Sequence, residues 1–171
     1  MSSTRTTGRN ETQIEAPPGQ PTIVITREFD APPERVFRAH TDPDLVARWL
    51  GPRQLSLHIE EFDARTGGSY RYVNRDDEGT EYGFRGVFHE VRPTERIVQT
   101  FSYDGFPDSV SLEIAVFEDL GGRTRLTGTS VLESVASRDA MVASGMETGV
   151  REGYERLDEL LDAGGDTPSD G

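Results

Sequence analysis

Histidines and glutamates are the residues of this sequence whose types could support acid–base or metal chemistry. The three histidines are far apart and show neither an HxH nor an HExxH spacing; they are His40, His58 and His89. The glutamates that could carry a shifted pKa, by residue type alone, are Glu60, Glu81, Glu90 and Glu113. There is no GxSxG, no phosphate-binding loop, no GxGxxG and no cysteine. We therefore predict no catalytic residue, no metal site and no cofactor, and we place His58 and His89 on solvent-facing rows of their strands.

A set of aromatic side chains is better suited to binding than to catalysis. They fall on strand-like segments, mostly with the same parity inside each segment, and so predict an aromatic concave sheet surface for a flat or greasy ligand. With Leu112, the sheet side of this predicted ligand site consists of Phe62, Tyr70, Tyr72, Tyr82, Phe84, Phe101 and Tyr103. Ordinary core packing is the alternative interpretation of the same residues.

A long helix near the C-terminus is predicted to pack on this surface. Apolar residues recur there at steps of four, four, seven and four, at Val142, Met146, Val150, Leu157 and Leu161. This spacing traces one face of a helix running from Ser137 to Leu161, with Ser137 as its N-cap.

A row of glycines follows one edge of that predicted helix. Gly145, Gly149 and Gly153 lie four apart, and each glycine costs a helix about 1 kcal/mol relative to alanine. The row therefore predicts a close neighbour or an open space along this edge. We expect Met141, Gly145 and Gly149 to line a cavity there, and Trp49 to come from a short helix that closes its mouth.

The elements upstream are predicted to form a sheet. Thr22–Phe29 has the pattern of a first strand, and Asp30 and Asp42 each introduce a short helix through a following proline. Six further segments have a period of two: Leu55–Ala64, Gly68–Arg75, Thr80–Val91, Arg96–Tyr103, Ser109–Glu118 and Arg123–Leu132. Because short turns join them, they predict antiparallel neighbours, and hence an α+β fold in which a seven-stranded sheet curves around the C-terminal helix.

Composition and charge indicate how the chain is divided into domains and which classes of binding partner it lacks. We expect a disordered leader at residues 1–21, one domain at residues 22–163 and a disordered tail at residues 164–171. The net charge of -13 argues against nucleic-acid binding, which needs clustered cations. No apolar run reaches membrane-spanning length and the N-terminus lacks the apolar core of a signal peptide, so we predict a cytoplasmic protein without membrane insertion.

Short motifs, in a characteristic order and spacing, resemble a known superfamily. They are Phe29–Phe37, Trp49–Pro52, Phe62–Tyr70, Gly86–Val91, Gly122–Thr127 and the region around Gly149. Together they resemble the START-like (SRPBCC) superfamily and, within it, the branch homologous to the C-terminal domain of the heat-shock-protein-ninety ATPase activator. The resemblance covers nearly all of residues 22–161.

The resemblance implies a helix-grip fold, in which the sheet and the long helix enclose a deep, mostly apolar cavity. Many relatives bind lipid-like or aromatic small molecules there, and some are cyclases or hydrolases. Many members carry tryptophan after the glycine of the last helix, where this chain has Val150. The eukaryotic activators have a further N-terminal domain that helps to clasp the chaperone, and the 21-residue leader is too short to replace it.

We expect a non-catalytic protein that binds a small hydrophobic or aromatic molecule in this cavity. One alternative is a cyclase-, dehydratase- or hydrolase-like enzyme that uses the same cavity. Another is a stress-response activator of a chaperone ATPase, and a homodimer is also left open.

Overall fold

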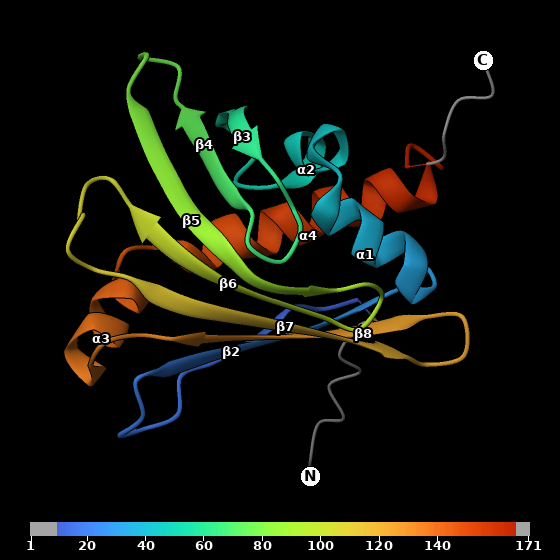
Figure 1. Cartoon of the computed structure of the whole chain (residues 1–171), viewed down its shortest axis with the longest axis horizontal. Helices are drawn as coiled ribbons and strands as arrows, with labels where there is room; N and C mark the ends of the chain where they lie inside the picture. The colour runs from blue at the N-terminus through green and yellow to red at the C-terminus, as the bar shows by residue number, and fades with distance from the viewer. Residues whose placement is uncertain (1–9, 167–171) are drawn as a thin grey trace, which may run out of the picture.

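One antiparallel sheet of eight strands forms the framework of the protein in this computed structural model, which describes residues 10–166. Along the sheet the strands follow the order β1-β2-β8-β7-β6-β5-β4-β3 (Figure 1). Their bounds are Gln13–Glu15 for β1, Thr22–Phe29 for β2, Ser56–Phe62 for β3, Ser69–Arg75 for β4, Glu81–Arg92 for β5, Arg96–Tyr103 for β6, Ser111–Asp119 for β7 and Thr124–Val131 for β8. The predicted α+β helix-grip fold is confirmed, with eight strands instead of seven.

The additional strand lies in the segment predicted to be a disordered leader. In β1, Ile14 pairs with Ile25 of β2, so the disorder prediction is wrong for residues 13–15. Three residues are too few to show a periodic pattern, and their strand pairing is with the neighbouring strand β2. Residues 1–9 lie outside the described part of the chain.

The beginning of the predicted disordered tail is also tied to the domain. Asp166 is 2 % exposed, and its carboxylate accepts hydrogen bonds from the Arg35 guanidinium at 2.6 and 2.8 Å. A charged residue in a loop shows no period, so this pairing left no signal in the sequence. Residues 167–171 of the predicted tail lie outside the described residues.

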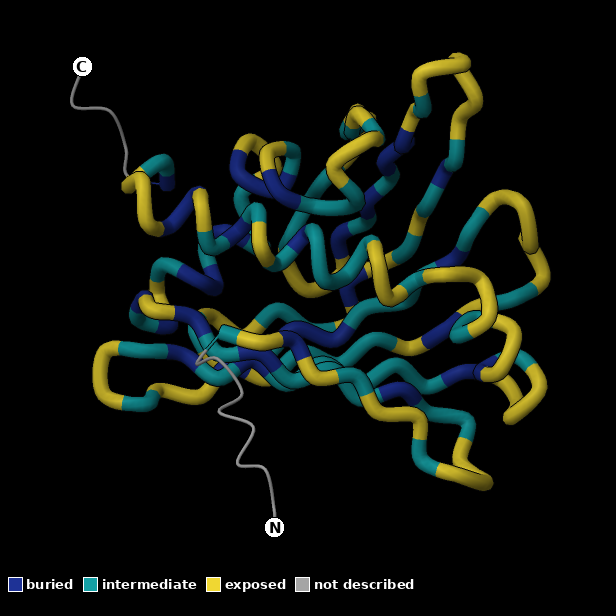
Figure 2. The backbone as a smooth tube through the Cα atoms, turned by 180° about the vertical axis from the view of Figure 1, so that it is seen from behind, coloured by how far each residue is buried: buried dark blue, intermediate teal, exposed yellow. Residues whose placement is uncertain are grey.

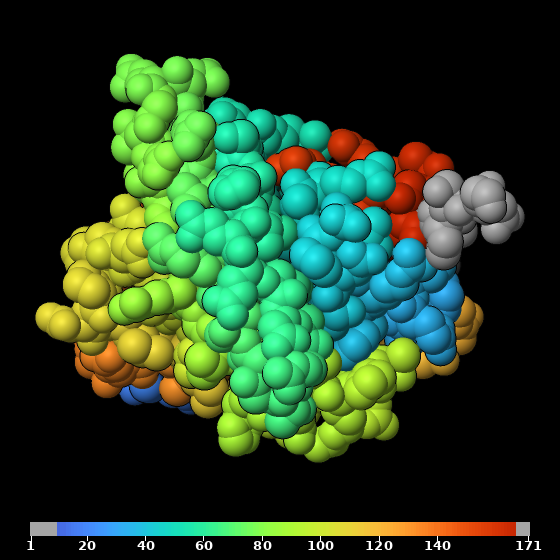
Figure 3. All heavy atoms as spheres, turned by 45° about the horizontal axis from the view of Figure 1, so that its top comes forward, coloured from blue at the N-terminus to red at the C-terminus, as the bar shows by residue number. Residues whose placement is uncertain are grey.

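Two short helices follow β2, as predicted. Helix α1 spans Pro33–Thr41 and helix α2 spans Pro43–Trp49. Each begins with a proline, and the Asp42 side chain caps α2 by accepting a hydrogen bond from the backbone N–H of Asp44 at 3.0 Å. Both helices lie beside the last helix of the chain, α4, which spans Met146–Asp162, and in the space-filling view they and the β3–β4 region lie in front of most of it (Figure 3).

The predicted single C-terminal helix is two helices, so that prediction is wrong. Helix α3 spans Val135–Ala143 and helix α4 spans Met146–Asp162. Between them Gly145 has a φ of +86°, a left-handed conformation that glycine adopts without the penalty of a Cβ. Ser134, rather than Ser137, caps α3, and its hydroxyl accepts from the Ser137 N–H at 3.0 Å.

Helix α4 packs across one face of the sheet and supplies the centre of the core. Leu157 is 0 % exposed, and Leu160 and Leu161 are buried beside it. In Figure 2 the buried residues are concentrated where the helices meet the sheet, while the residues at the hairpin tips are exposed. In residues 10–166 no helix combines the length and the apolar character needed to cross a membrane.

Candidate ligand-binding site

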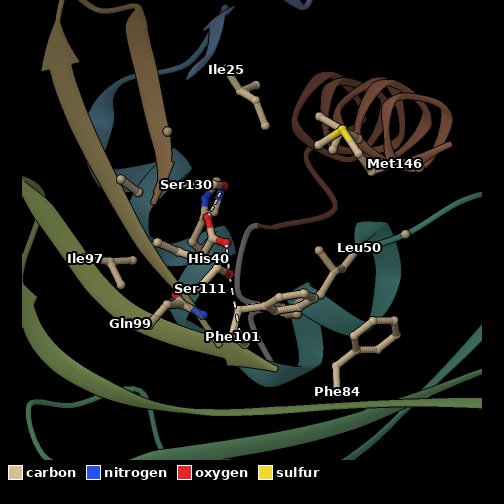
Figure 4. A pocket seen from close by; sticks show the side chains of 18 of the residues that line it. Ile25, His40, Leu50, Phe84, Ile97, Gln99, Phe101, Ser111, Ser130 and Met146 are labelled. Atoms are coloured by element: carbon tan, nitrogen blue, oxygen red, sulfur yellow. Dashed lines mark hydrogen bonds between the residues drawn. The ribbon is translucent and has the colours of Figure 1, made fainter. Parts of the chain in front are cut away.

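A cavity of about 410 Å³ lies between the sheet and α4. This volume falls within the range of small-molecule sites in proteins, roughly 300–1,000 Å³. Figure 4 shows side chains that enclose it, with Gln99, Ser111 and Ser130 from the sheet and Met146 from α4. The wall is mostly apolar, so the space suits an apolar guest.

Eight of the twelve residues predicted to bind a ligand lie in the cavity wall. They come from α2, four strands, α3 and α4, and they are Trp49, Phe62, Tyr70, Tyr72, Phe84, Phe101, Met141 and Gly149. The fold therefore brings together residues as far apart in the sequence as Trp49 and Gly149, which are separated by 100 positions. Direct contact of these side chains with a ligand remains a prediction.

The other four predicted residues lie outside the wall. Gly145 is the exposed break between α3 and α4, and Leu112 is 38 % exposed because it points away from the cavity. Tyr82 and Tyr103 share the aromatic face but stand further along the sheet, where the hydroxyl of Tyr82 donates to Asp76 at 3.4 Å.

The aromatic row continues from the cavity wall to the surface. The rings of Phe101 and Phe84 stack with centroids 5.3 Å apart, and Tyr103 lies 5.2 Å from Phe84. Phe106 follows at 6.0 Å from Tyr103 and is 71 % exposed. Tyr103 therefore connects the cavity to an exposed aromatic side chain.

The glycine edge of α4 meets the loop after α2. A Cβ at Gly153 would lie 3.4 Å from the carbonyl oxygen of Trp49 and from the backbone nitrogen of Gly51, and one at Gly149 would lie 3.6 Å from Pro52 Cδ. The predicted close neighbour is thus present at these two glycines. At Gly145 the predicted alternative, open space, is found instead.

Glu113, one of the four glutamates that the sequence offered by residue type alone, supplies the carboxyl group of the cavity wall. It lies on β7 between Gln99 of β6 and Ser130 of β8, and it lines the cavity. One carboxylate oxygen accepts a hydrogen bond from Ser111 Oγ at 2.7 Å, and the other accepts a short one from Ser130 Oγ. Burial raises the pKa of Glu113, although the two serine hydroxyls act to lower it.

The orientation of β7 explains why Glu113 was not among the residues predicted to bind a ligand. Leu112, Ile114 and Val116 alternate in the sequence, a pattern that usually indicates a buried face. In the structure Leu112 and Val116 are about two-fifths exposed, whereas Glu113 and Ala115 line the cavity, and of the alternating apolar residues only Ile114 lines it with them. Reversed patterning of this kind is typical of functional surfaces, because a folded protein tolerates it only at a cost in stability.

Three tyrosines accompany Glu113 in the wall. Burial raises the pKa of Tyr70, Tyr72 and Tyr154, the last to about 12. The hydroxyl of Tyr70 donates to the carbonyl of Thr100 at 2.5 Å. All three phenols are therefore neutral near pH 7, and they add polarity to the wall without adding charge.

His40 is the histidine that reaches the cavity. Its Nδ1 donates to the carbonyl of Val36 at 2.7 Å, so Nε2 carries the lone pair, and Nε2 is buried without a hydrogen-bond partner in the described residues. Its ring packs edge-on against Trp49 and Phe117, with centroids 4.8 and 5.3 Å away. Burial lowers the pKa of His40 from 6.5 to about 4.

We predict that His40 makes stability fall as the pH is lowered from 6.5 towards 4. In this window the imidazole of the unfolded chain binds a proton and that of the folded chain does not. The free energy of unfolding therefore falls by about 2–3 kcal/mol between about pH 7.5 and about pH 4.5. Urea unfolding at both pH values measures the loss. The variant His40→Gln lacks this titration, so its free energy of unfolding should fall by about 2–3 kcal/mol less over the same pH interval. If the free energy of unfolding falls equally with pH in the two proteins, the prediction is wrong.

The remaining histidines lie away from the cavity. His58 and His89 are both exposed, which confirms their predicted solvent-facing positions. Within residues 10–166 no three or more histidine, aspartate or glutamate side chains are grouped so that they could hold a metal ion.

Comparisons with known proteins place this chain among similar domains. Residues 30–162 match the family model described as Activator of Hsp90 ATPase homolog 1-like protein. A crystal structure of a Rhodobacter sphaeroides protein is 30% identical, covers 90% of this chain and 99% of its own, and superposes with a TM-score of 0.82. A Chromobacterium violaceum protein is 31% identical over 81% of this chain and 96% of its own, with a TM-score of 0.71. An Arthrobacter aurescens protein solved by NMR is 25% identical over 92% of each chain, with a TM-score of 0.81. No curated protein gives a significant match.

Proposed function

Because the chain belongs to the Activator of Hsp90 ATPase homolog 1-like family of the START-like (SRPBCC) superfamily, whose fold encloses a cavity, we propose that it binds a small hydrophobic or aromatic molecule there. The observation that carries the proposal is the cavity of about 410 Å³ between the sheet and α4. Its wall combines stacked aromatic rings with a few polar groups, which is the usual composition of a small-molecule site.

Val150 of α4 offers a way to fill this cavity without touching the polar groups. It lines the cavity. A Val150→Trp variant places an indole in the space that a ligand would occupy. Val150 lies inside α4 and has no positive φ, so the backbone can accept tryptophan there.

We predict that Val150→Trp abolishes the binding of apolar probes. For the unmodified protein, N-phenyl-1-naphthylamine should gain fluorescence, and a saturating concentration should raise the melting temperature by about 5–10 °C through mass action. The variant should show neither effect while keeping its helical circular dichroism signal, because exclusion from the cavity and unfolding are separate effects.

The matched control is Val116→Trp, which adds the same side chain on the outer face of β7, where Val116 is 40 % exposed. This variant should bind the probe like the unmodified protein. If the unmodified protein fails to bind the probe, or if Val150→Trp binds it as well as Val116→Trp does, the cavity is not a binding site.

The family description supports a second candidate, activation of a chaperone ATPase. An activator would contact the chaperone through its surface, so Val150→Trp should stimulate the ATPase as strongly as the unmodified protein. Absence of both binding and stimulation when the purified domain is mixed with the host chaperone would exclude this candidate.

A further inference from the structure

The polar groups of the cavity are unbalanced: acceptors are present and cations are absent. Among the described residues the wall contains a carboxyl group, that of Glu113, and no arginine, although all 18 basic residues of the chain are arginines. Two further acceptors in the wall, Nε2 of His40 and Oδ1 of Asn74, are buried and have no hydrogen-bond partner in residues 10–166.

The hydrogen bonds of Glu113 leave its charge uncompensated. Ser111 and Ser130 donate one hydroxyl each to its two oxygens, and no salt bridge to Glu113 is formed within the described chain. The charge of Glu113 acts on the phenols of Tyr70, Tyr72 and Tyr154, which are neutral near pH 7. An ionised carboxylate here is costly, and a cation brought in by a ligand would offset that cost.

The same arrangement discriminates against anionic ligands. A fatty acid or other carboxylate would bring a negative charge beside the Glu113 carboxyl group, in a cavity whose described wall offers no guanidinium to receive it.

We propose that the ligand of this cavity is an apolar or aromatic molecule carrying a protonated amine, which pairs with Glu113 while its apolar body packs against the aromatic wall. This inference rests on the proposed binding function and narrows its ligand class. It also assigns Glu113 as the residue that determines specificity.

Three probes of nearly equal size and different head groups test the proposal: 4-phenylbutylamine, 4-phenylbutanol and 4-phenylbutanoate. Calorimetric titration of the full chain near neutral pH should show the amine binding about ten- to a hundredfold more tightly than the alcohol, as expected for a buried charge-assisted hydrogen bond. The carboxylate should bind more weakly than the alcohol.

The variant Glu113→Gln keeps the size of the side chain and can still hydrogen-bond to both serines. It should lose about tenfold or more in affinity for the amine, with the affinity for the alcohol unchanged within about threefold. Glu81→Gln is the matched control, because Glu81 is 53 % exposed and pairs with Arg75 outside the cavity. It should bind all three probes like the unmodified protein.

A pH series of the unmodified protein gives a second measurement that needs no variant. From about pH 7.5 to about pH 5 the affinity for the amine should fall, because the amine requires the ionised carboxylate, and the affinity for the alcohol should stay constant. His40 and the three tyrosines around the cavity remain neutral throughout this range.

The possible outcomes separate this inference from the proposed function. Alcohol binding without a preference for the amine, tighter binding of the carboxylate, or equal amine affinity in Glu113→Gln and Glu81→Gln would overturn the amine assignment alone. If none of the three probes binds the unmodified protein, both the amine assignment and cavity binding fail.

Discussion

Replacing Leu157 with alanine is expected to lower the free energy of unfolding by about 2–5 kcal/mol, through lost burial and the void left behind. Leu157 lies in the middle of α4, is 0 % exposed and belongs to the core formed by α4 and the sheet. Because the surrounding rings and helices are held by many other contacts, the void can collapse only partly. Urea unfolding monitored by circular dichroism measures the change.

The matched control is the same substitution at Leu112, which is 38 % exposed on the outer face of β7. Leu112→Ala should change stability by no more than about 0.5 kcal/mol, as surface substitutions usually do. A loss below about 0.5 kcal/mol for Leu157→Ala as well would show that the buried face of the C-terminal helix has been assigned wrongly.

Replacing Asp158 with asparagine is expected to cost about 3–5 kcal/mol, because it leaves a buried guanidinium without its counter-ion. Arg27 of β2 is 2 % exposed and its Nη2 lies 2.5 Å from Asp158 Oδ2. The guanidinium also donates to Thr12 Oγ1 and to the carbonyl of Glu28, and its Cζ stands 4.9 Å above the centre of the Phe29 ring. These neutral partners hold Arg27 in place but do not balance its charge.

Two further variants make this prediction specific. Glu155 is 60 % exposed and stands 3.8 Å from Arg53, so Glu155→Gln should cost no more than about 1 kcal/mol. Combining Arg27→Met with Asp158→Asn should restore part of the stability, because the stranded charge is then gone. If Asp158→Asn lowers the free energy of unfolding no more than Glu155→Gln does, Arg27 is solvated and its charge does not depend on Asp158.

Local patterns predicted most of the elements. Period-two segments became the strands β2 to β8, and the prolines after Asp30 and Asp42 mark the starts of α1 and α2. These signals are readable because strands and helix starts depend on residues that are close together in the chain.

The helix break and the first strand were not predictable in this way. The apolar step of four from Val142 to Met146 continues across Gly145 as if the helix were unbroken, because residue spacing does not record the left-handed backbone of Gly145. The three residues of β1 acquire their conformation from pairing with β2.

The sequence by itself determined which residues share a face. It placed Tyr70, Tyr72, Phe84 and Phe101 on one aromatic surface and Leu157 on the apolar face of a helix, because side-chain direction follows from the strand and helix periods alone.

Only the tertiary structure decided which faces became the cavity. A period of two separates Leu112 from Glu113 but does not say which of them faces inwards; the position of α4 over the sheet decides that. The same packing brings His40 of α1 into the wall beside residues from β6 and β7. The residue type of Glu113 is visible in the sequence, but its place in the cavity wall without a cation beside it is not, because the wall is formed by segments that are distant in the chain and meet only in the folded protein.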